Sequence, residues 1–466
     1  MDTHIEPTRP TIEPTPHLRP HAHFTPDSTW MNDPNGLVFF GETYHLFFQN
    51  NPSGATWGNL SWGHATSTDL VTWIEQPVAL WHTENEFIFS GSTVVDHDNT
   101  SGFAAPGQTA LVAIYTSSYT SASPLHGRQA QSLAYSVDGG QSWTTHAGNP
   151  VLDRSSGEFR DPKVFWWGGG DGYWVMVAVE AVDRTVVLYS SPDLRSWTYL
   201  SKFGPSHAVA GVWECPDLFL LPVAGTDLHR WVLVVSLNPG GLAGGGGAQY
   251  FVGDFDGVTF TPERISETDD PTSFDWLDHG RDYYATVSFD NVPDNRRLMV
   301  GWANNWDYAN EIPTAPWRSA MSLVREVDLV EDVDGRRRLR QRPVLPPEGL
   351  GVTVLDLTVP LTPGVVTEIT VSTEDDADPW VLTVDGASRT ITADRHECGN
   401  VDFHPLFASR DTARLVGDDD TVQLQVIVDA SVIEVFAQGG LVTLTQQVFP
   451  RAPLTKPRVR THQPST

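Results

Sequence analysis

The sequence predicts an all-β protein, a five-bladed β-propeller followed by a C-terminal β-sandwich, and three observations support this prediction. A pattern of a strand, Ser-x-Asp or Ser-Pro-Asp, a short turn and Trp recurs at residues 65–73, 135–143 and 189–197, with a weaker copy at 253–260. Hardly any segment shows the periodicity of an amphipathic helix. Beyond residue 345, apolar and polar residues alternate strictly, as in antiparallel strands that are buried on one face.

The recurring pattern predicts the first domain. Short strands and turns that repeat at intervals of roughly 60 residues are typical of a radial array of four-stranded blades, and five such blades would fill residues 26–345. A large sandwich that repeats a Ser/Asp hairpin is the alternative. Strands are expected at residues 37–40, 44–49, 110–116, 173–179, 185–189, 231–236 and 297–302.

The regions outside the propeller have different compositions. Residues 1–25 are polar and rich in Pro and His, and we expect them to form an N-terminal tail. Residues 346–352 follow a dense group of prolines and are predicted to be a linker. Residues 353–466 are predicted to form a β-sandwich. Its strands are expected at residues 365–371, 380–384, 422–428, 432–437 and 441–446.

Composition excludes several partners. The chain has 58 acidic and 29 basic residues, which makes nucleic acid or an anionic membrane an unfavourable partner, whereas a neutral sugar is compatible. Cys215 and Cys398 imply no disulfide framework. The spacing of His17, His21 and His23 does not suit a zinc site, and we expect no metal and no cofactor. The N-terminus has no apolar signal core, which predicts a cytoplasmic protein, or a secreted one if a leader precedes this sequence.

Three acidic motifs are candidates for catalysis. Asp33 lies between two asparagines, a proline and a glycine just before an apolar run, and its alternative role is an Asx-turn. Asp161 follows Arg160, and such a pair is often part of a solvated loop. Glu214 stands between Trp213 and Cys215, so it should be partly desolvated, as suits a general acid. A structural acid paired to an arginine is the alternative for Glu214.

The predicted propeller brings these acids together. Blades that begin near residue 30 place Asp33 in the first blade, Asp161 in the third and Glu214 in the fourth. Because the innermost strands of a propeller converge on its central channel, the three carboxylates should be neighbours in space.

The three motifs resemble those of glycoside hydrolase family 32, the β-fructofuranosidases, levanases and inulinases. The resemblance implies that Asp33 is the nucleophile, Asp161 the transition-state stabiliser and Glu214 the acid/base of a retaining double displacement at β-fructosyl bonds. Residues 428–436 are similar to the family's sandwich signature, although Ala430 stands where arginine is more usual. The substrate-binding residues that the resemblance implies are Asn32, Gln49, Trp57, Phe89, Ser90, Arg160 and Trp302.

The resemblance also limits the substrate. Residues 301–318 are similar to those of the fructan-hydrolase branch, in which the residue matching Trp302 is thought to stack on the sugar. Arg281 stands where sucrose-cleaving relatives have lysine. We therefore expect cleavage of fructans or fructo-oligosaccharides of the levan or inulin type, with sucrose as a further substrate. Fructosyl transfer and a non-catalytic carbohydrate-binding propeller are the alternatives.

Overall fold

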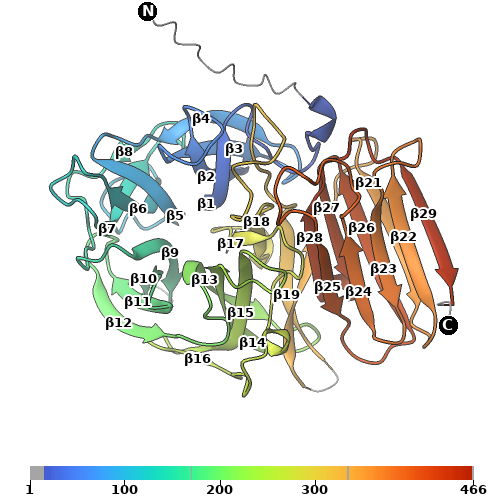
Figure 1. The fold of residues 1–466 in the computed structure, drawn as a ribbon. Helices are drawn as coiled ribbons and strands as arrows, with labels where there is room; N and C mark the ends of the chain where they lie inside the picture. Colours follow the sequence, from blue (N-terminus) through green and yellow to red (C-terminus); the bar gives the residue numbers. More distant parts are fainter. Residues whose placement is uncertain (1–14, 169–170, 333–334, 464–466) are drawn as a thin grey trace, which may run out of the picture.

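The protein is an all-β molecule with two units that lie side by side (Figure 1). The computed structural model describes residues 15–168, 171–332 and 335–463. Within these residues the regular elements are 29 strands and four short 3-10 helices. No helix among them is long and apolar enough to cross a membrane. The helices are η1 (Pro16–Leu18), η2 (Pro271–Ser273), η3 (Pro293–Asn295) and η4 (Gln438–Gly440).

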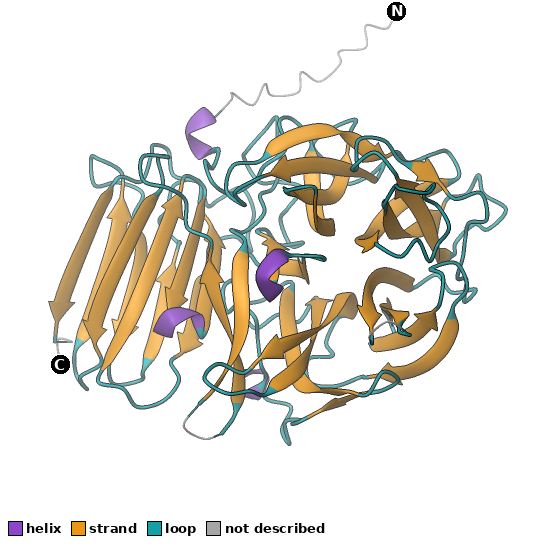
Figure 2. Cartoon of the chain, turned by 180° about the vertical axis from the view of Figure 1, so that it is seen from behind, coloured by secondary structure: helices purple, strands orange, loops and turns teal. Residues whose placement is uncertain are grey.

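The first unit is a ring of five four-stranded antiparallel sheets within the described residues, each built from four strands that are consecutive in the chain. Figures 1 and 2 show the sheets around a common centre. The first strand of each sheet is innermost, and β1 contacts β5 and β17, β5 contacts β9, and β13 contacts β9 and β17. The strands are β1 (Trp30–Phe40), β2 (Thr43–Asn51), β3 (Ser61–Ser67), β4 (Ile74–Leu80); β5 (Glu86–Asp96), β6 (Ala110–Tyr119), β7 (Gln129–Ser136), β8 (Thr144–Thr145); β9 (Phe159–Trp167), β10 (Tyr173–Glu180), β11 (Thr185–Ser191), β12 (Thr198–Phe203); β13 (Val212–Pro222), β14 (His229–Asn238), β15 (Gly247–Phe255), β16 (Phe260–Pro262); β17 (Tyr284–Ser288), β18 (Leu298–Trp302), β19 (Arg325–Glu331) and β20 (Arg337–Pro343).

The recurring Ser/Asp pattern of the sequence forms the turn between the third and fourth strands of a sheet. In the first sheet the Ser67 hydroxyl donates to Asp69 Oδ1 (3.0 Å), which also accepts the backbone N–H groups of the second and third residues after it (2.9 and 2.7 Å). Asp138, Asp193 and Asp256 make similar contacts in the next three sheets. The repeat is therefore an Asx-type turn that fixes one hairpin per sheet.

The second unit packs two sheets face to face (Figure 1). Their order is β21-β26-β27-β28 and β25-β24-β23-β22-β29. The apolar residues of the alternating pattern form the core between them, and Trp380, Ile369 and Val426 have no exposed surface. The five strands expected here are confirmed. The strands are β21 (Thr353–Pro360), β22 (Val366–Ser372), β23 (Trp380–Asp385), β24 (Thr390–Asp394), β25 (Arg410–Arg414), β26 (Thr421–Asp429), β27 (Val432–Ala437), β28 (Val442–Gln447) and β29 (Lys456–His462).

Residues 15–25 pack against both units and do not form the polar tail that the sequence predicted. Leu18 and Phe24 are buried. His23 lies between two carboxylates of the second unit, with Nδ1 2.8 Å from Asp429 Oδ2 and Nε2 3.0 Å from Glu434 Oε1. The apolar side chains and the histidine both gain partners far away in the sequence, which explains why local composition was misleading. Residues 1–14 of the expected tail lie outside the described residues.

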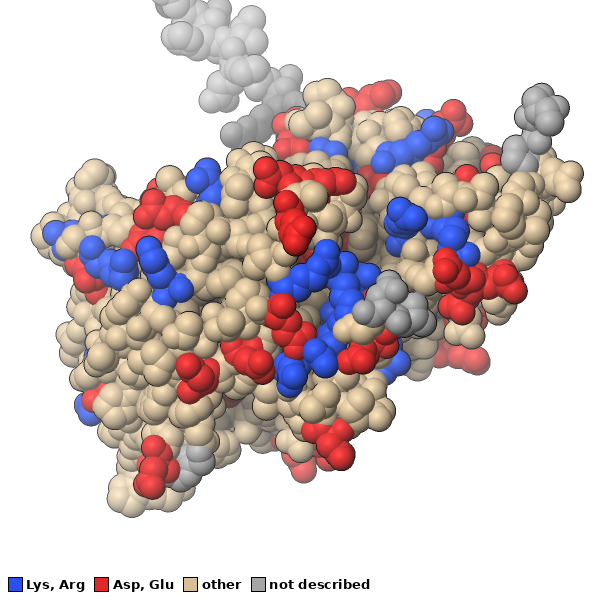
Figure 3. Space-filling model, turned by 90° about the horizontal axis from the view of Figure 1, so that it is seen from below, with Lys and Arg blue, Asp and Glu red and all other residues tan. Residues whose placement is uncertain are grey.

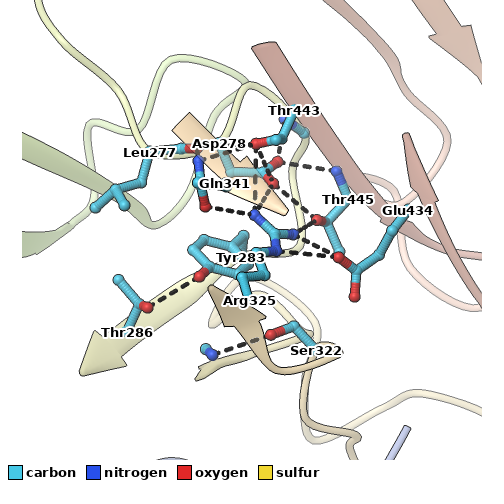
Figure 4. A network of polar contacts seen from close by, with 12 residues as sticks. Leu277, Asp278, Tyr283, Thr286, Ser322, Arg325, Gln341, Glu434, Thr443 and Thr445 are labelled. Atoms are coloured by element: carbon cyan, nitrogen blue, oxygen red, sulfur yellow. Dashed lines mark hydrogen bonds and ion pairs between the residues drawn. The ribbon is translucent and has the colours of Figure 1, made fainter. Parts of the chain in front are cut away.

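A buried polar network joins the ring to the second unit (Figure 4). Arg325 of β19 donates to Asp278 Oδ2 (3.1 Å), to Glu434 Oε2 (2.6 Å) and to the Thr445 hydroxyl (2.8 Å). Neither Arg325 nor Glu434 has exposed side-chain surface. Removing one partner of such a buried pair leaves an uncompensated charge, so this network fixes how the two units dock.

The arginine-rich strand β20 is compensated by acidic residues. Arg340 pairs with Asp328 (2.5 Å), and Arg338 pairs with Asp332 (2.7 Å). On the face of the molecule shown in Figure 3, basic side chains likewise lie beside acidic ones. The charges of Arg338 and Arg340 are therefore compensated within the fold.

Candidate active site

Every innermost strand of the ring has a β-bulge at the same end. The pairing register shifts in β1, β5, β9, β13 and β17 at residues that include Asp33, Ser90, Asp161, Cys215 and Ala285. A bulge adds a residue to one strand and re-aims its side chain. A small central cavity is lined by residues from all five of these strands.

The position of Asp33, the candidate nucleophile, differs from the predicted one. Asp33 lies inside β1, whereas the sequence placed it in a turn before the strand. The local side-chain contact here is the Asn35 amide, which donates to the Asp33 carbonyl oxygen (3.2 Å). Asp161 and Cys215 have φ angles of +61° and +46°, which are unfavourable for residues other than glycine. Such backbone strain is concentrated at functional sites.

The three candidate acids meet around Cys215. The Cys215 backbone N–H donates to Asp161 Oδ2 (2.9 Å), and its Sγ lies 3.6 Å from Asp33 Oδ2 and 3.8 Å from Asp161 Oδ2. Arg160 Nε lies 3.1 Å from Glu214 Oε1 and 3.9 Å from Asp161 Oδ2. Carboxylates from the first, third and fourth sheets thus share one site, as the sequence predicted.

Asp33 is held by donors on both of its oxygens. The Ser90 hydroxyl donates to Oδ2 (2.6 Å), and the Asn32 amide donates to Oδ1 (3.0 Å). Asn32 is itself fixed by the Trp30 indole N–H (2.8 Å). Burial raises the pKa of Asp33, the charge of Glu214 adds to this, and the hydrogen bonds from Ser90 and Asn32 oppose it.

The pKa of Asp161 is strongly perturbed. Burial is the main cause that raises its pKa to about 7; the positive charge of Arg160 opposes this shift, and the negative charges of Glu214 and Asp33 add to it. Its backbone N–H donates to the Thr116 hydroxyl (3.0 Å). A carboxyl shifted this far by its neighbours is a feature of catalytic sites.

Glu214 is partly open to solvent, with 23% of its side chain exposed. The Tyr284 hydroxyl donates to Oε2 (2.5 Å), and Arg160 binds the other oxygen. Burial and the charge of Glu214 raise the pKa of Tyr284 well above its usual value, so this phenol remains a donor. Tyr284 was missed by the sequence reasoning. Its place at the start of an apolar strand in the last repeat is the signal that could have found it.

A run of glycines packs closely against Tyr284 and its neighbour Asn305. A Cβ atom on Gly246 would lie 2.7 Å from the Tyr284 ring, and one on Gly245 would lie 2.1 Å from Asn305 Oδ1. The Asn305 amide donates to the carbonyl oxygens of Gly244 and Arg281 (3.3 and 2.7 Å). The run between β14 and β15 is therefore closely packed backbone in the wall of the site, and only glycine fits there.

Three of the expected substrate contacts surround the acids in different ways. Gln49 is buried, and neither polar atom of its amide has a hydrogen-bond partner within the described part of the chain. A buried amide without partners is unfavourable unless a ligand supplies them. Trp57 is 45% exposed, and its ring meets that of Phe89 edge to face at 6.5 Å.

Trp302 is placed differently from the prediction. It has no exposed surface, its indole N–H donates to the Met31 carbonyl oxygen (3.1 Å), and its ring packs against those of Trp30 and Trp306 (6.2 and 4.8 Å). This burial differs from the exposed stacking surface that was expected, and the sugar contact of Trp302 stays a prediction. Trp302 supports Trp30 and, through it, the Asn32 amide that orients Asp33.

The fold and the carboxylate cluster define a carbohydrate-active hydrolase. A model of the glycosyl hydrolases family 32 N-terminal domain matches residues 23–343, and a model of the C-terminal domain of the same family matches residues 352–463. The chain belongs to glycosyl hydrolase family 32, and it is a glycosidase.

Named relatives agree with this assignment. The chain is 42% identical to the levanase of Bacillus subtilis, an alignment that covers 93% of this chain and 66% of the levanase. It is 40% identical to the extracellular exo-inulinase of Aspergillus ficuum, over 93% of this chain and 89% of that protein. The crystal structure of exo-inulinase from Aspergillus awamori superposes with a TM-score of 0.86 at 37% identity, covering 96% of both chains.

Proposed function

We propose that the five sheets are the blades of a five-bladed β-propeller with a C-terminal β-sandwich, and that the enzyme hydrolyses terminal β-D-fructofuranosyl bonds in fructans or fructo-oligosaccharides, with sucrose as a further substrate. The observation that carries this proposal is the convergence of Asp33, Asp161 and Glu214 around Cys215. Relatives named levanase and exo-inulinase support the class of substrate.

In the first half of the proposed reaction, Asp33 attacks the anomeric carbon of the terminal fructosyl unit. The bond to the leaving oxygen breaks as Glu214 gives that oxygen a proton, and a covalent fructosyl-enzyme results. The donors Ser90 and Asn32 orient the attacking carboxylate, since they bind both of its oxygens.

In the second half, Glu214 removes a proton from water, and the water oxygen replaces Asp33 at the anomeric carbon to release fructose. The hydrogen bonds from Tyr284 and Arg160 keep the Glu214 carboxyl in one orientation for both proton transfers. Asp161 binds ring hydroxyls while positive charge develops on the sugar, so its contacts are strongest in the transition state. The unpartnered Gln49 amide offers a further hydrogen-bonding site for the bound sugar.

The test is fructose release from levan, inulin and sucrose, supplied separately, by variants Asp33→Asn and Glu214→Gln. Each should lose about 10²–10⁴-fold or more in kcat, because each removes a group that takes part in bond making or proton transfer. Asp254→Asn is a matched control, since that side chain is 71% exposed. Turnover close to wild type in either active-site variant contradicts the assigned roles.

The chemical course is tested by NMR on the first-formed anomer. Double displacement predicts that fructose is released with the configuration of the bond that was cleaved. Inversion would refute the nucleophilic role of Asp33. Oligosaccharide or dianhydride products instead of free fructose would identify fructosyl transfer, in which a sugar hydroxyl replaces water in the second half.

A further inference from the structure

Residues 81–90 cross the bulged end of the first sheet from its outer edge to its centre. The pairs Met31 with Asn50, Asn50 with Ser61, and Trp62 with Leu80 place the ends of β1, β2, β3 and β4 together. Figure 1 shows β4 at the outer side of this sheet. Three spacings between strands put Leu80 about 14 Å from β1. The chain then returns inward to β5, where Ser90 donates to Asp33.

Aromatic side chains lie along residues 81–90. Trp81 at its outer end is 58% exposed. Phe87 and Phe89 follow toward the centre and are half-buried. Trp57, from the loop between β2 and β3, meets Phe89 and is 45% exposed. Trp57 and Trp81 are the exposed tryptophans of the described residues, and both lie at the end of the sheet that carries Asp33. Clustered exposed aromatic surface marks an interaction site.

The path is rigid. The Thr83 hydroxyl accepts the backbone N–H groups of Asn85 and Glu86 (3.2 Å each). The His82 ring nitrogen Nδ1 lies 2.9 Å from the Ser61 hydroxyl, and the Ile88 N–H donates to the Leu60 carbonyl oxygen (2.9 Å). A surface that is already ordered loses little entropy when it binds a ligand.

We propose that Trp81, Phe87 and Phe89 form an aromatic track that binds the fructosyl units of a fructan chain beyond the unit held at Asp33. This inference rests on the proposed function. Sugar rings carry apolar C–H faces that pack on aromatic rings, and a neutral chain suits this acidic protein. Because Leu80, next to Trp81, lies three strand spacings from β1, we expect Trp81 to contact units of a chain beyond a disaccharide bound at Asp33 and to discriminate by chain length.

The expected effect follows from the covered area. Packing a sugar on one face of an indole removes on the order of 60 Å² of apolar surface from water, which corresponds to about tenfold in affinity. Trp81→Ala should therefore lower kcat/KM on long-chain levan or inulin about tenfold and leave kcat/KM on sucrose unchanged, with the loss in KM rather than kcat. Trp81→Phe should recover most of the loss.

The experiment measures kcat and KM of wild type, Trp81→Ala, Trp81→Phe and Tyr199→Ala on sucrose and on the polymers. Tyr199 is the matched control, because it is 49% exposed on β12 of the third sheet. A loss restricted to polymers supports the track. No loss, or an equal loss on sucrose and polymer, overturns it while the proposed function stands. A wild type that releases fructose from none of these substrates overturns the proposed function and the track with it.

Discussion

Replacing His23 with Gln should remove a contribution to stability that depends on pH. Burial alone would lower the pKa of His23, but the hydrogen bonds and charges of Asp429 and Glu434 outweigh it and raise the pKa from 6.5 to about 9. Against the effect of burial, His23 is the main cause that lowers the pKa of Asp429 to about 2, whereas the charge of Arg325, with His23 adding to it, lowers the pKa of Glu434 to about 2. The folded protein therefore binds the His23 proton more tightly than the unfolded chain does.

The magnitude follows from the shift. Moving the pKa from 6.5 to about 9 corresponds to roughly 3 kcal/mol at about 1.4 kcal/mol per pH unit. Because the folded-state value is the raised one, this contribution is fully present below pH 6.5 and is lost as pH rises through about 9. The lowered pKa of Asp429 reflects the same contact with His23 and that of Glu434 mainly reflects Arg325, so neither shift is added to this figure.

Urea unfolding of wild type and His23→Gln, followed by tryptophan fluorescence between pH 6 and pH 10, measures this difference. Wild type should be more stable at pH 6 by roughly 3 kcal/mol, with the gap closing toward pH 10. His17→Gln is the control, because His17 lies in the same segment and contacts the Pro450 carbonyl oxygen (3.0 Å) in place of a carboxylate. A difference that stays constant with pH would refute the charged His23.

Three further outcomes are expected. Asp161→Asn should stabilise the fold by about 2–4 kcal/mol above pH 7 and have no effect on stability at pH 4. The raised pKa of Asp161 makes its ionisation unfavourable in the folded state, and the substitution removes that cost. Urea unfolding at both pH values measures the difference. Gly246→Ala should lower kcat without unfolding the protein, since its Cβ would lie 2.7 Å from the Tyr284 ring, whereas Gly54→Ala, with open space around its Cβ, should not. The Cys215 thiol should resist alkylation at pH 8 until the protein is unfolded, because burial and the neighbouring carboxylates raise its pKa well above the usual value.

Much of the fold could be predicted because its signals are local. Alternation along residues 422–428 and 432–437 predicted β26 and β27. The repeated Ser/Asp turn gave the spacing of the sheets, and it needs only contacts within four residues of Asp69, Asp138 or Asp193. Signals of this kind can be read from one segment alone, without knowing which other segments it packs against.

The differences between the sequence-based expectations and the structure have one cause. Residues 15–25 look like a polar tail, but His23 finds carboxylates more than 400 residues away. Trp302 was expected to be accessible to a sugar, but it has no exposed surface and its ring packs against those of Trp30 and Trp306. The burial of a side chain depends on every segment that packs around it, and no local pattern contains that information.

The sequence by itself predicted which acids share one site, in which repeat each lies, and that their strands converge. Only the tertiary structure decided what each acid experiences: the bulges that aim Asp33 and Asp161 inward, the Tyr284 hydroxyl on Glu214, and the shift of the Asp161 pKa to about 7. The physical reason is that residue types and strand periods are properties of a segment. Desolvation, electric fields and hydrogen-bond geometry are properties of the whole neighbourhood that folding assembles.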